Sequence, residues 1–375
     1  MNFKEINLDK VLKYTQPAKY IVQSTEYSDK FKTPVLTAGK NFLLGYTNEK
    51  EGIYKDVPAI IFDDFTTSFH YVDFPFKVKS SALKILNVRS DQVDIKYVYY
   101  QMEGVKIDTQ LHKRYWISRF SKKEIPLPSL ETQKQIAQTL DNAATLRDKT
   151  QQLIAEYDQL AQSIFLDMFG DPVTNPKGWN LIKLGDAGEL NRGKSKHRPR
   201  NAPELLGGKY PLIQTGDIAN SNGYINEYNS TYSELGLSQS KMWPKGTLCI
   251  TIAANIAKTG ILKFDACFPD SVVGFIPNKL TNNIFVQYWM SFLQKIIEEK
   301  APVSAQKNIN LKILRELEFY CPPFHLQNQF AEKIALIEQQ KDLAKQELQE
   351  SEDLFQALLQ KAFHPAEKHD ESELV

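Results

Sequence analysis

The chain has 375 residues, of which 42% are hydrophobic and 24% charged, and its formal net charge is +1. This composition is typical of a soluble globular protein with two or three domains. It excludes a membrane-spanning protein, because no apolar run reaches the ~18 residues of a membrane span, and the charged N-terminus lacks the apolar core of a signal peptide.

Residues 1–128 are predicted to form a first domain of mixed strands and helices. An apolar run over residues 57–65 predicts a buried strand, and the alternation of apolar and polar residues over 70–79 predicts a half-buried strand. The segment 92–102 is compatible with either a helix or a strand, and periodicity does not separate the two.

A long helix is predicted over residues 131–168, which contain neither glycine nor proline. Pro126 and Pro128 end the preceding domain, and Ser129 or Thr132 caps the helix. A helix of this length spans roughly 57 Å, which is typical of a spacer rather than of an ordinary domain. One residue in every three or four forms a coiled-coil seam: Ile136, Leu140, Ala143, Arg147, Thr150, Ile154, Tyr157, Ala161, Ile164 and Met168.

The second half of the chain is predicted to repeat this order of elements. A cluster of prolines and glycines over 169–179 forms a turn. Residues 246–264 resemble two strands around a polar turn, and 282–300 form an amphipathic helix. A second long helix covers 325–363, and the acidic segment 366–375 is predicted to be a disordered tail.

An internal repeat relates the two long helices. A shift of 194 residues places 125–140 over 319–334 and matches four identical pairs: Pro128 with Pro322, Gln133 with Gln327, Gln135 with Gln329, and Ala137 with Ala331. The seam recurs as Phe330, Ile334, Ile337, Lys341, Ala344, Leu348, Ser351, Phe355, Leu358 and Ala362. The helices are therefore predicted to pair as an antiparallel coiled coil, with Arg147 and Lys341 at matching polar positions.

Looser matches extend the repeat into the domains. PVLTAG at 34–39 aligns with PLIQTG at 211–216, and GYTNE at 45–49 aligns with GYINE at 223–227. The sequence therefore predicts a duplicated unit, a domain followed by a helix.

The segment Gly188 to Ser195 has the letters of a phosphate-binding loop, G-x-x-x-x-G-K-S. Such a loop requires a helix that begins at the lysine. Lys194 is followed instead by Pro199 and Pro203 without apolar periodicity, so we expect no nucleotide site.

Two basic clusters, one in each half, indicate contacts to nucleic-acid phosphates. The first surrounds Lys113, Arg114 and Tyr115, and the second combines Arg192, Lys194, Lys196, Arg198 and Arg200. Each cluster is also compatible with a solvated basic loop.

Polar residues in predicted loops are candidates for reading base edges, because amide and basic side chains form specific hydrogen bonds with bases. In the first domain these are Lys40, Asn41, Tyr46, Thr67, Ser68 and His70. In the second they are Asn220, Asn222, Tyr224, Asn255, Lys258 and Lys307, with Asn220, Asn222 and Tyr224 expected at the place related to Lys40, Asn41 and Tyr46.

Signatures of catalysis are missing from the sequence. Asp63 and Asp64 are adjacent and would point to opposite faces of a strand. The six histidines have no metal-ligand spacing, and no nucleophile elbow occurs. Cys249, Cys267 and Cys321 form no CxxC pair and are expected to be reduced thiols of a cytoplasmic protein. We therefore expect no catalytic residues and no metal site in this chain.

With its duplicated domains and helices, the chain resembles the specificity (S) subunits of type I restriction–modification enzymes. The junctions IPLPSLETQKQIA and CPPFHLQNQFAEKI are similar to the entry into the conserved helices of this family. KTPVLTAGKNFLLGYTNE and GWNLIKLGDAGELNRGKS resemble parts of its recognition domains. The resemblance implies an α+β chain with two target recognition domains, 1–128 and 171–323, and two helical spacers, 129–170 and 324–365.

The resemblance also implies a function and partners. Such subunits bind a bipartite DNA site, with one recognition domain on each half-site. Two methylation (M) subunits supply S-adenosylmethionine and adenine-N6 chemistry, and two restriction (R) subunits supply cleavage that depends on ATP and magnesium. A non-catalytic coiled-coil scaffold with duplicated peptide-binding domains is the alternative, and a nucleotide-dependent enzyme using Gly188 to Ser195 is a third.

Overall fold

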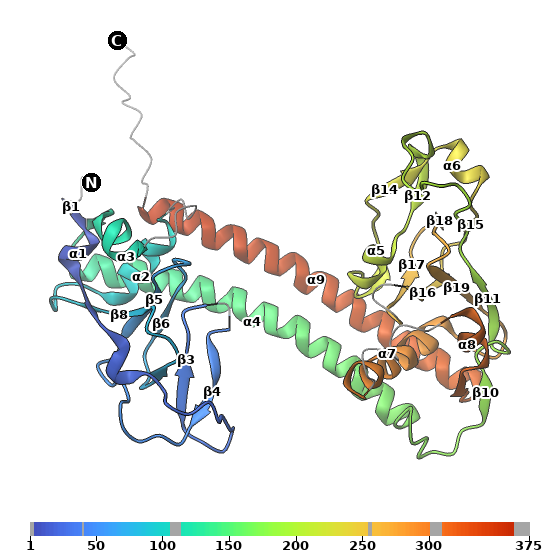
Figure 1. The fold of residues 1–375 in the computed structure, drawn as a ribbon, viewed down its shortest axis with the longest axis horizontal. Coiled ribbons are helices and arrows are strands. Elements are labelled where there is room, and N and C mark those ends of the chain that lie inside the picture. Colours follow the sequence, from blue (N-terminus) through green and yellow to red (C-terminus); the bar gives the residue numbers. More distant parts are fainter. Residues whose placement is uncertain (1–3, 40, 106–113, 254–256, 301–309, 364–375) are drawn as a thin grey trace, which may run out of the picture. The chain divides into compact units, whose positions relative to one another are not determined.

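The chain divides into two compact units, which are described separately below (Figure 1). Unit 1 comprises residues 1–151 and 345–375, and unit 2 comprises residues 152–344. The computed structural model describes residues 4–39, 41–105, 114–253, 257–300 and 310–363.

Unit 1 contains two main sheets, in the strand orders β2-β8-β5-β6 and β4-β3-β7. Its strands are β1 (Lys4–Asn7), β2 (Leu12–Thr15), β3 (Thr33–Leu36), β4 (Leu43–Thr47), β5 (Ala59–Asp63), β6 (Phe69–Val72), β7 (Lys77–Val78), β8 (Leu83–Val88) and β9 (Glu124–Leu127). Its helices are α1 (Leu8–Val11), α2 (Ile95–Glu103), α3 (Tyr115–Ser118), two short 3₁₀ turns (Pro17–Tyr20 and Phe120–Lys122), and a part of each long helix, α4 (Leu130–Phe169) and α9 (Phe324–Phe363).

The elements of unit 1 confirm one prediction from the sequence, correct another and resolve a segment that the sequence left open. The strand predicted over 57–65 is confirmed as β5, but the strand predicted over 70–79 is interrupted between β6 and β7. Pro75 lies in the interruption, where it cannot donate a backbone hydrogen bond. The ambiguous segment 92–102 is mostly helical, because the Asp94 side chain accepts a hydrogen bond from Tyr97 N and caps α2.

Unit 2 contains a five-stranded sheet, β11-β19-β16-β17-β13, and a four-stranded one, β14-β12-β18-β15. Its strands are β10 (Leu181–Lys183), β11 (Gly188–Arg192), β12 (Leu206–Leu212), β13 (Gly223–Ile225), β14 (Ser230–Tyr232), β15 (Met242–Trp243), β16 (Leu248–Thr251), β17 (Thr259–Leu262), β18 (Ala266–Cys267), β19 (Val272–Pro277) and β20 (Glu318–Tyr320). Its helices are α5 (Thr215–Ala219), α6 (Glu234–Ser238), α7 (Asn283–Lys300), α8 (Leu311–Glu316), a 3₁₀ turn (Pro203–Leu205), and the remaining parts of α4 and α9. The two strands predicted within 246–264 and the helix predicted over 282–300 are confirmed.

The strand order shows that the two units share a topology. The order β2-β8-β5-β6 in unit 1 corresponds to β11-β19-β16-β17 in unit 2, and unit 2 adds β13 parallel to β17. In the smaller sheets β3 pairs in parallel with β7, and β12 pairs in parallel with β18. The sequence match of 34–39 with 211–216 begins on the equivalent strands β3 and β12 and is confirmed there.

The second loose match is wrong. GYTNE begins in β4, which pairs with β3 in the smaller sheet of unit 1. GYINE begins in β13, which pairs with β17 in the larger sheet of unit 2. Tyr46 and Tyr224 are therefore not at related places, and the shared letters reflect composition rather than a common structure.

A buried glutamine docks each long helix onto its domain in the same way. Gln133 is 1% exposed; its amide oxygen accepts from Asp94 N (2.8 Å), and its amide nitrogen donates to Gln92 O (3.2 Å) and Pro128 O (2.9 Å). Gln327 is fully buried; its oxygen accepts from Asn282 N (2.9 Å), and its nitrogen donates to Leu280 O (3.0 Å) and Pro322 O (2.8 Å). Gln133 and Gln327, which match in the sequence repeat, therefore form equivalent hydrogen bonds that fix each long helix to its domain.

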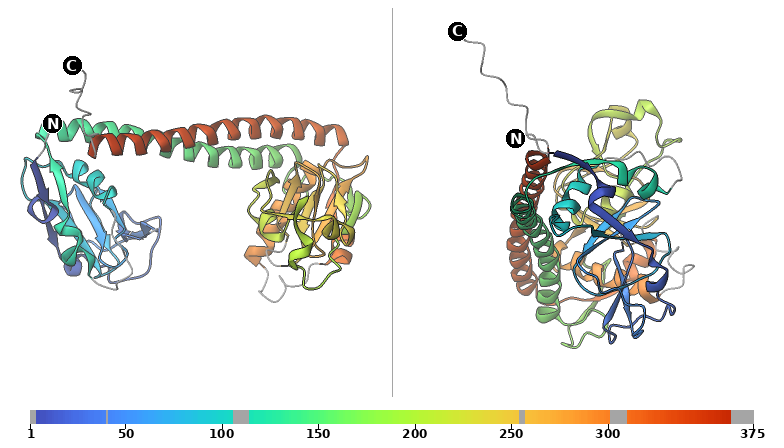
Figure 2. Two further views of the ribbon diagram at one scale, coloured as in Figure 1. Left: turned by 90° about the horizontal axis from the view of Figure 1, so that it is seen from above. Right: turned by 90° about the vertical axis from the view of Figure 1, so that its left-hand side faces the viewer.

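Within each unit the segments of α4 and α9 lie side by side and run antiparallel (Figures 1 and 2). In unit 2, Phe165 packs on Phe330 with ring centroids 5.5 Å apart, while Asp158, earlier in α4, contacts Lys341, later in α9. In unit 1, the Arg147 guanidinium lies 5.0 Å from the ring centroid of Phe355. Every residue of the predicted seam is buried or half-buried, so the coiled-coil periodicity is confirmed.

Two polar seam positions have different partners. Lys341 is 4% exposed, and its Nζ lies 2.7 Å from Asp158 Oδ1 and 3.1 Å from Glu338 Oε1. Burial alone lowers the pKa of Lys341, but the hydrogen bonds and charges of the two carboxylates outweigh burial and raise it. Arg147 instead stacks on Phe355 and pairs with its neighbour Asp148. The two matching polar positions, Lys341 and Arg147, are therefore each stabilised by different neighbours.

Candidate DNA interface

In unit 1 the turn between β5 and β6 defines one end of the larger sheet, which we call the hairpin end. Asp63 N donates to Ser68 O (2.8 Å) and Thr67 N donates to Asp63 O (3.1 Å), which closes the turn. Thr67 has φ +61°, a left-handed conformation that is uncommon for a residue other than glycine. Such strain is concentrated at functional loops in proteins.

Asp64 joins a second segment to this hairpin end. It is 2% exposed, and its backbone and side-chain oxygens accept from Tyr115 N (3.0 Å) and Trp116 N (2.8 Å). Its carboxylate also lies 3.4 Å from Nζ of the buried Lys84. These bonds hold the exposed Arg114 beside the turn that contains Thr67 and Ser68.

His70 brings a third segment of unit 1 to the same face. Its Nε2 lies 3.1 Å from Gly39 O, and its ring packs against Phe42 with centroids 4.7 Å apart. The exposed Asn41 lies in the turn between Gly39 and Phe42, closed by the bond from Thr37 N to Phe42 O. The predicted residues Asn41, Thr67, Ser68, His70 and Arg114 therefore gather in one region.

Unit 2 has an equivalent hairpin between β16 and β17. Thr251 N donates to Lys258 O (3.0 Å) and Ala257 N donates to Thr251 O (2.9 Å), the same two bonds as in unit 1. Ala257 has φ +62°, matching Thr67. Lys258 is thus the structural counterpart of Ser68.

Strand register places the other candidates of unit 2 at its hairpin end. Arg192, the last residue of β11, pairs with Val273, and Val272 pairs with Thr251 at the end of β16. The basic loop after Arg192 therefore starts beside the turn. Since β13 is parallel to β17, with Gly223 opposite Gly260, Asn220 and Asn222 also precede their strand at this end.

The basic loop of unit 2 is partly neutralised by Asp270. The Arg192 Nε donates to Asp270 O (2.8 Å), and the Asp270 carboxylate pairs with Arg200 (2.5 Å) and Arg198 (3.7 Å). Lys194 and Lys196 are exposed and form no ion pair with another described residue. They are consequently the cations of this loop best placed to meet phosphate.

The loop geometry also excludes a phosphate-binding loop of the P-loop type. β11 precedes Gly193 as that motif requires, but residues 193–198 form no helix. A Cβ at Gly193 would lie 2.2 Å from Phe268 O and 2.4 Å from Pro269 O, so glycine is needed there for close backbone packing. The letters G-x-x-x-x-G-K-S are thus accounted for by sheet packing.

Several predicted residues lie elsewhere. Tyr115 is 1% exposed, so its ring is packed inside unit 1 and is not presented to a ligand. Tyr46 is half-buried in β4. Tyr224 is half-buried and lines an inner pocket of unit 2. The remaining predicted residues lie outside the described residues: Lys40, Lys113, Asn255 and Lys307.

The sequence did not reveal the roles of Asp64 and Asp270, which organise the two hairpin ends. The adjacent pair Asp63 and Asp64 indicates only a poor metal site in the sequence, and Asp270 lies 70 residues from Arg200. For Asp64 the sequence does offer a signal, because a carboxylate that directly follows a buried apolar strand needs hydrogen-bond donors. For Asp270 the sequence offers no such signal.

No helix in the described part of the chain is long and apolar enough to cross a membrane. No group of three or more histidine, cysteine or acidic side chains among the described residues could hold a metal ion. The described cysteines, Cys249, Cys267 and Cys321, are unpaired thiols, and burial raises the pKa of each.

Comparisons with known proteins agree with this architecture. A family model described as the type I restriction modification DNA specificity domain matches twice, over residues 1–157 and 176–352. The specificity subunit of the type I restriction enzyme EcoR124I/EcoR124II from Escherichia coli is 34% identical over 300 residues, which cover 75% of this chain and 72% of that protein.

Solved structures show the same fold at lower identity. The S subunit of a type I restriction–modification system from M. genitalium has a TM-score of 0.62 and 19% identity, over 98% of this chain and 97% of that one. A chain from a study of complex assembly and conformational transition of the type I R-M system has a TM-score of 0.57 and 14% identity, over 96% and 97%. The chain belongs to the family of type I restriction–modification specificity subunits.

Proposed function

We propose that this chain recognises a bipartite DNA site, with the hairpin end of each unit on one half-site and the paired helices as the spacer. The observation that carries the proposal is the equivalence of the two hairpin ends. Each has a non-glycine residue in the left-handed conformation at the same place in the turn, Thr67 in unit 1 and Ala257 in unit 2. Each also gathers polar or basic residues from separate segments, as expected of surfaces that combine phosphate and base contacts.

The outer faces of the long helices are proposed docking surfaces for partner subunits. Exposed leucines recur at intervals of seven along α4, and further exposed leucines lie along α9, although the seam between the two helices is already filled. Their side chains are between 37% and 65% exposed: Leu146, Leu153 and Leu160 on α4, and Leu336, Leu343 and Leu354 on α9. Apolar side chains repeated along one helix face indicate an interaction surface. We assign it to two methylation subunits, which would position two restriction subunits in turn.

Chemistry is proposed to reside in those partners. S-adenosylmethionine, ATP and magnesium would bind to the methylation and restriction subunits, and this chain would act without catalysis in the cytoplasm. The alternative is a scaffold that binds peptides, since a filled seam and exposed leucines suit that role equally. It leaves the basic loop and the equivalent hairpin ends without a purpose.

Salt dependence separates the two functions. DNA affinity of the full chain with its methylation partner is expected to fall steeply between 50 and 200 mM salt, with a log–log slope near −0.9 for each phosphate contact. Changing Lys194→Ala together with Lys196→Ala should make the slope shallower by about two. Filter binding or fluorescence anisotropy measures both.

A matched control removes the same charge elsewhere in unit 2. Lys209 is exposed on β12 and pairs with Glu234, and the exposed Lys279 follows β19 at the end of the sheet opposite the hairpin end. The double change Lys209→Ala and Lys279→Ala should leave the slope unaltered. An equal effect of both double variants, or salt-independent binding, would contradict DNA recognition through the hairpin end.

A further inference from the structure

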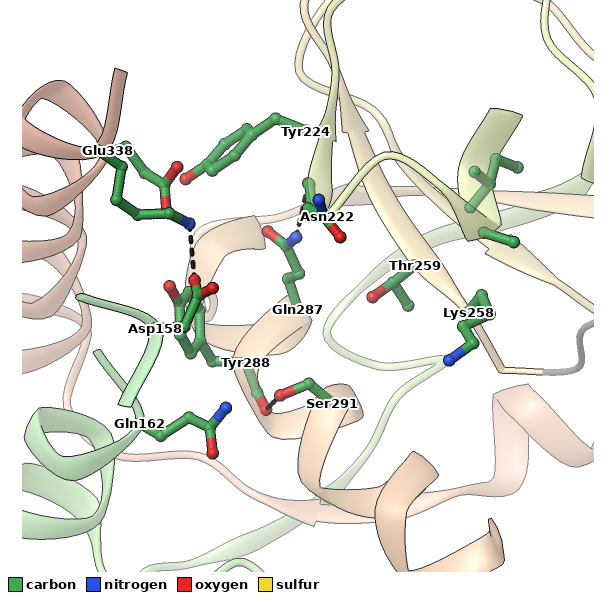
Figure 3. Close-up of a pocket in the computed structure, with 14 residues that line it drawn as sticks. Asp158, Gln162, Asn222, Tyr224, Lys258, Thr259, Gln287, Tyr288, Ser291 and Glu338 are labelled. Atoms are coloured by element: carbon green, nitrogen blue, oxygen red, sulfur yellow. Dashed lines mark hydrogen bonds and ion pairs between the residues drawn. The ribbon is translucent and has the colours of Figure 1, made fainter. Parts of the chain in front are cut away.

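A pocket of about 310 Å³ lies inside unit 2, between the domain and the long helices (Figure 3). Asp158 of α4 and Glu338 and Lys341 of α9 form one wall, and Gln287, Tyr288 and Ser291 of α7 form another. The rim contains Asn222, Lys258 and Thr259 from the hairpin end of the sheet, and Tyr224 of β13 also lines the pocket. The volume is at the lower end of the ~300–1,000 Å³ range of small-ligand pockets.

Gln287 presents an unused hydrogen-bond acceptor in this pocket. The residue is 6% exposed, and its amide nitrogen donates to Gly223 O at 2.6 Å. Its amide oxygen is buried and has no hydrogen-bond partner among the described residues. Figure 3 shows this oxygen turned toward the side of the pocket on which Tyr224, Glu338 and Asp158 lie. A buried acceptor left unpaired costs free energy, so the site suits a ligand that donates an N–H.

The charges of the lining argue against an ionic ligand. Lys341 already bridges Asp158 and Glu338, and Lys258 lies on the opposite side of the pocket. Two carboxylates are thus balanced by two ammonium groups. Burial raises the pKa of Tyr224 and of Tyr288, so both hydroxyls remain protonated donors at neutral pH.

The two tyrosine rings, several amide and hydroxyl groups and a neutral total charge together match a planar heteroaromatic base. Bases stack on aromatic side chains and donate N–H groups from their pairing edges. Asn222 and Lys258, which line the rim, are also candidates for DNA contact at the hairpin end, so the pocket opens where DNA would lie.

We propose that this pocket receives a nucleobase swung out of the duplex in the half-site bound by unit 2. The proposal rests on the DNA recognition proposed above and adds a subsite to it. The described residues of unit 1 form no equivalent site: the docking glutamines align Asp94 with Asn282, and Tyr99 thereby occupies the position of Gln287. The Tyr99 ring packs edge-on against Phe69 and Tyr71, with centroids 5.6 and 6.1 Å apart. Besides the adenines that the methylation subunits would extrude for methylation, one extrahelical position, in one half-site, is therefore expected.

The test uses the full chain with its methylation partner and a set of duplexes, each with one base pair of the target replaced by a mismatch. Extruding a base costs unpairing energy, and a mismatch removes part of that cost. The set leaves out the adenines that are methylated, because the methylation subunits would extrude these bases themselves. Among the remaining positions we expect one, in one half-site, at which a mismatched duplex binds roughly tenfold more tightly than the paired duplex. Gln287→Met removes the acceptor, and Tyr224→Leu removes a ring. Each variant should lose the tighter binding of the mismatched duplex (the mismatch gain) and still bind the fully paired duplex.

Tyr228→Leu is the matched control. This tyrosine is exposed, packs against Phe264 and does not line the pocket, so the mismatch gain should persist. Normal duplex binding without a gain at any position, or a gain that survives both pocket variants, would overturn the proposal and leave DNA recognition intact. Absence of duplex binding by the unaltered complex would refute DNA recognition itself. Saturable binding of free adenosine or cytidine that depends on Gln287, without a mismatch gain, would assign the pocket to a free nucleotide and also overturn the proposal.

Discussion

Removing one heptad from each long helix is expected to shorten the gap between the two half-sites by about three base pairs. Deleting 148–154 from α4 and 344–350 from α9 keeps the seam in phase, because a heptad returns each helix to its own frame. The loss of seven residues shortens each helix by about 10 Å, which is about three base pairs at ~3.4 Å each. Inserting one heptad in each helix should lengthen the gap by the same amount.

Adenine-methylation mapping in cells measures the gap and both half-site sequences together. Both half-site sequences should stay the same, because every residue of the two hairpin ends is retained. Lys149→Ala with Gln152→Ala, two exposed positions on α4, is a control that keeps the length and should leave the gap unchanged. Altered half-site sequences, or an unchanged gap in a variant that still methylates DNA, would refute the spacer role of the helices.

Replacing a docking glutamine should destabilise its own unit by roughly 3 kcal/mol or more. Gln133→Leu leaves Asp94 N, Gln92 O and Pro128 O without their partner, and each unpaired buried group costs ~1–3 kcal/mol. Gln327→Leu does the same to Asn282 N, Leu280 O and Pro322 O in unit 2. Hydrogen exchange should accelerate in α2 for the first variant and in α7 for the second.

Gln135→Leu and Gln329→Leu are the controls. These residues lie two positions further along the same helices and also match in the repeat, but both are exposed. They should change neither hydrogen exchange in α2 and α7 nor the midpoint of urea unfolding, which the two docking-glutamine variants should lower. Equal destabilisation by Gln135→Leu and Gln133→Leu would show that the hydrogen bonds of the buried amide are not what holds the helix to its domain.

Elements defined by local spacing could be predicted from the sequence. The seam of α4 and α9 depends on a heptad period that the sequence displays directly, and both junctions keep their proline and glutamine. The sequence match of β3 with β12 likewise reflected a real equivalence. By contrast, the letters GYTNE and GYINE suggested an equivalence that hydrogen-bond register contradicts, since β4 and β13 belong to different sheets.

The candidate interface could be predicted only as separate segments. Nothing local to Arg192 and Lys258 indicates that they share one end of a sheet, because the register of β11, β19 and β16 brings them there. Burial of Tyr115 depends on packing across unit 1. Gln287 stands out in the sequence as a single amide in the apolar run IFVQYWM. That its side-chain oxygen has no hydrogen-bond partner among the described residues follows only from the structure.

Adenine-methylation mapping of cells that express this chain with its methylation partner tests the central claim most directly. The account predicts one motif made of two short specific halves separated by a fixed, non-specific gap, present only when the chain is expressed. Lys194→Ala with Lys196→Ala should weaken methylation without altering the motif, because these lysines are assigned to phosphate. A single continuous motif, or methylation that does not depend on this chain, would contradict bipartite recognition by the two hairpin ends.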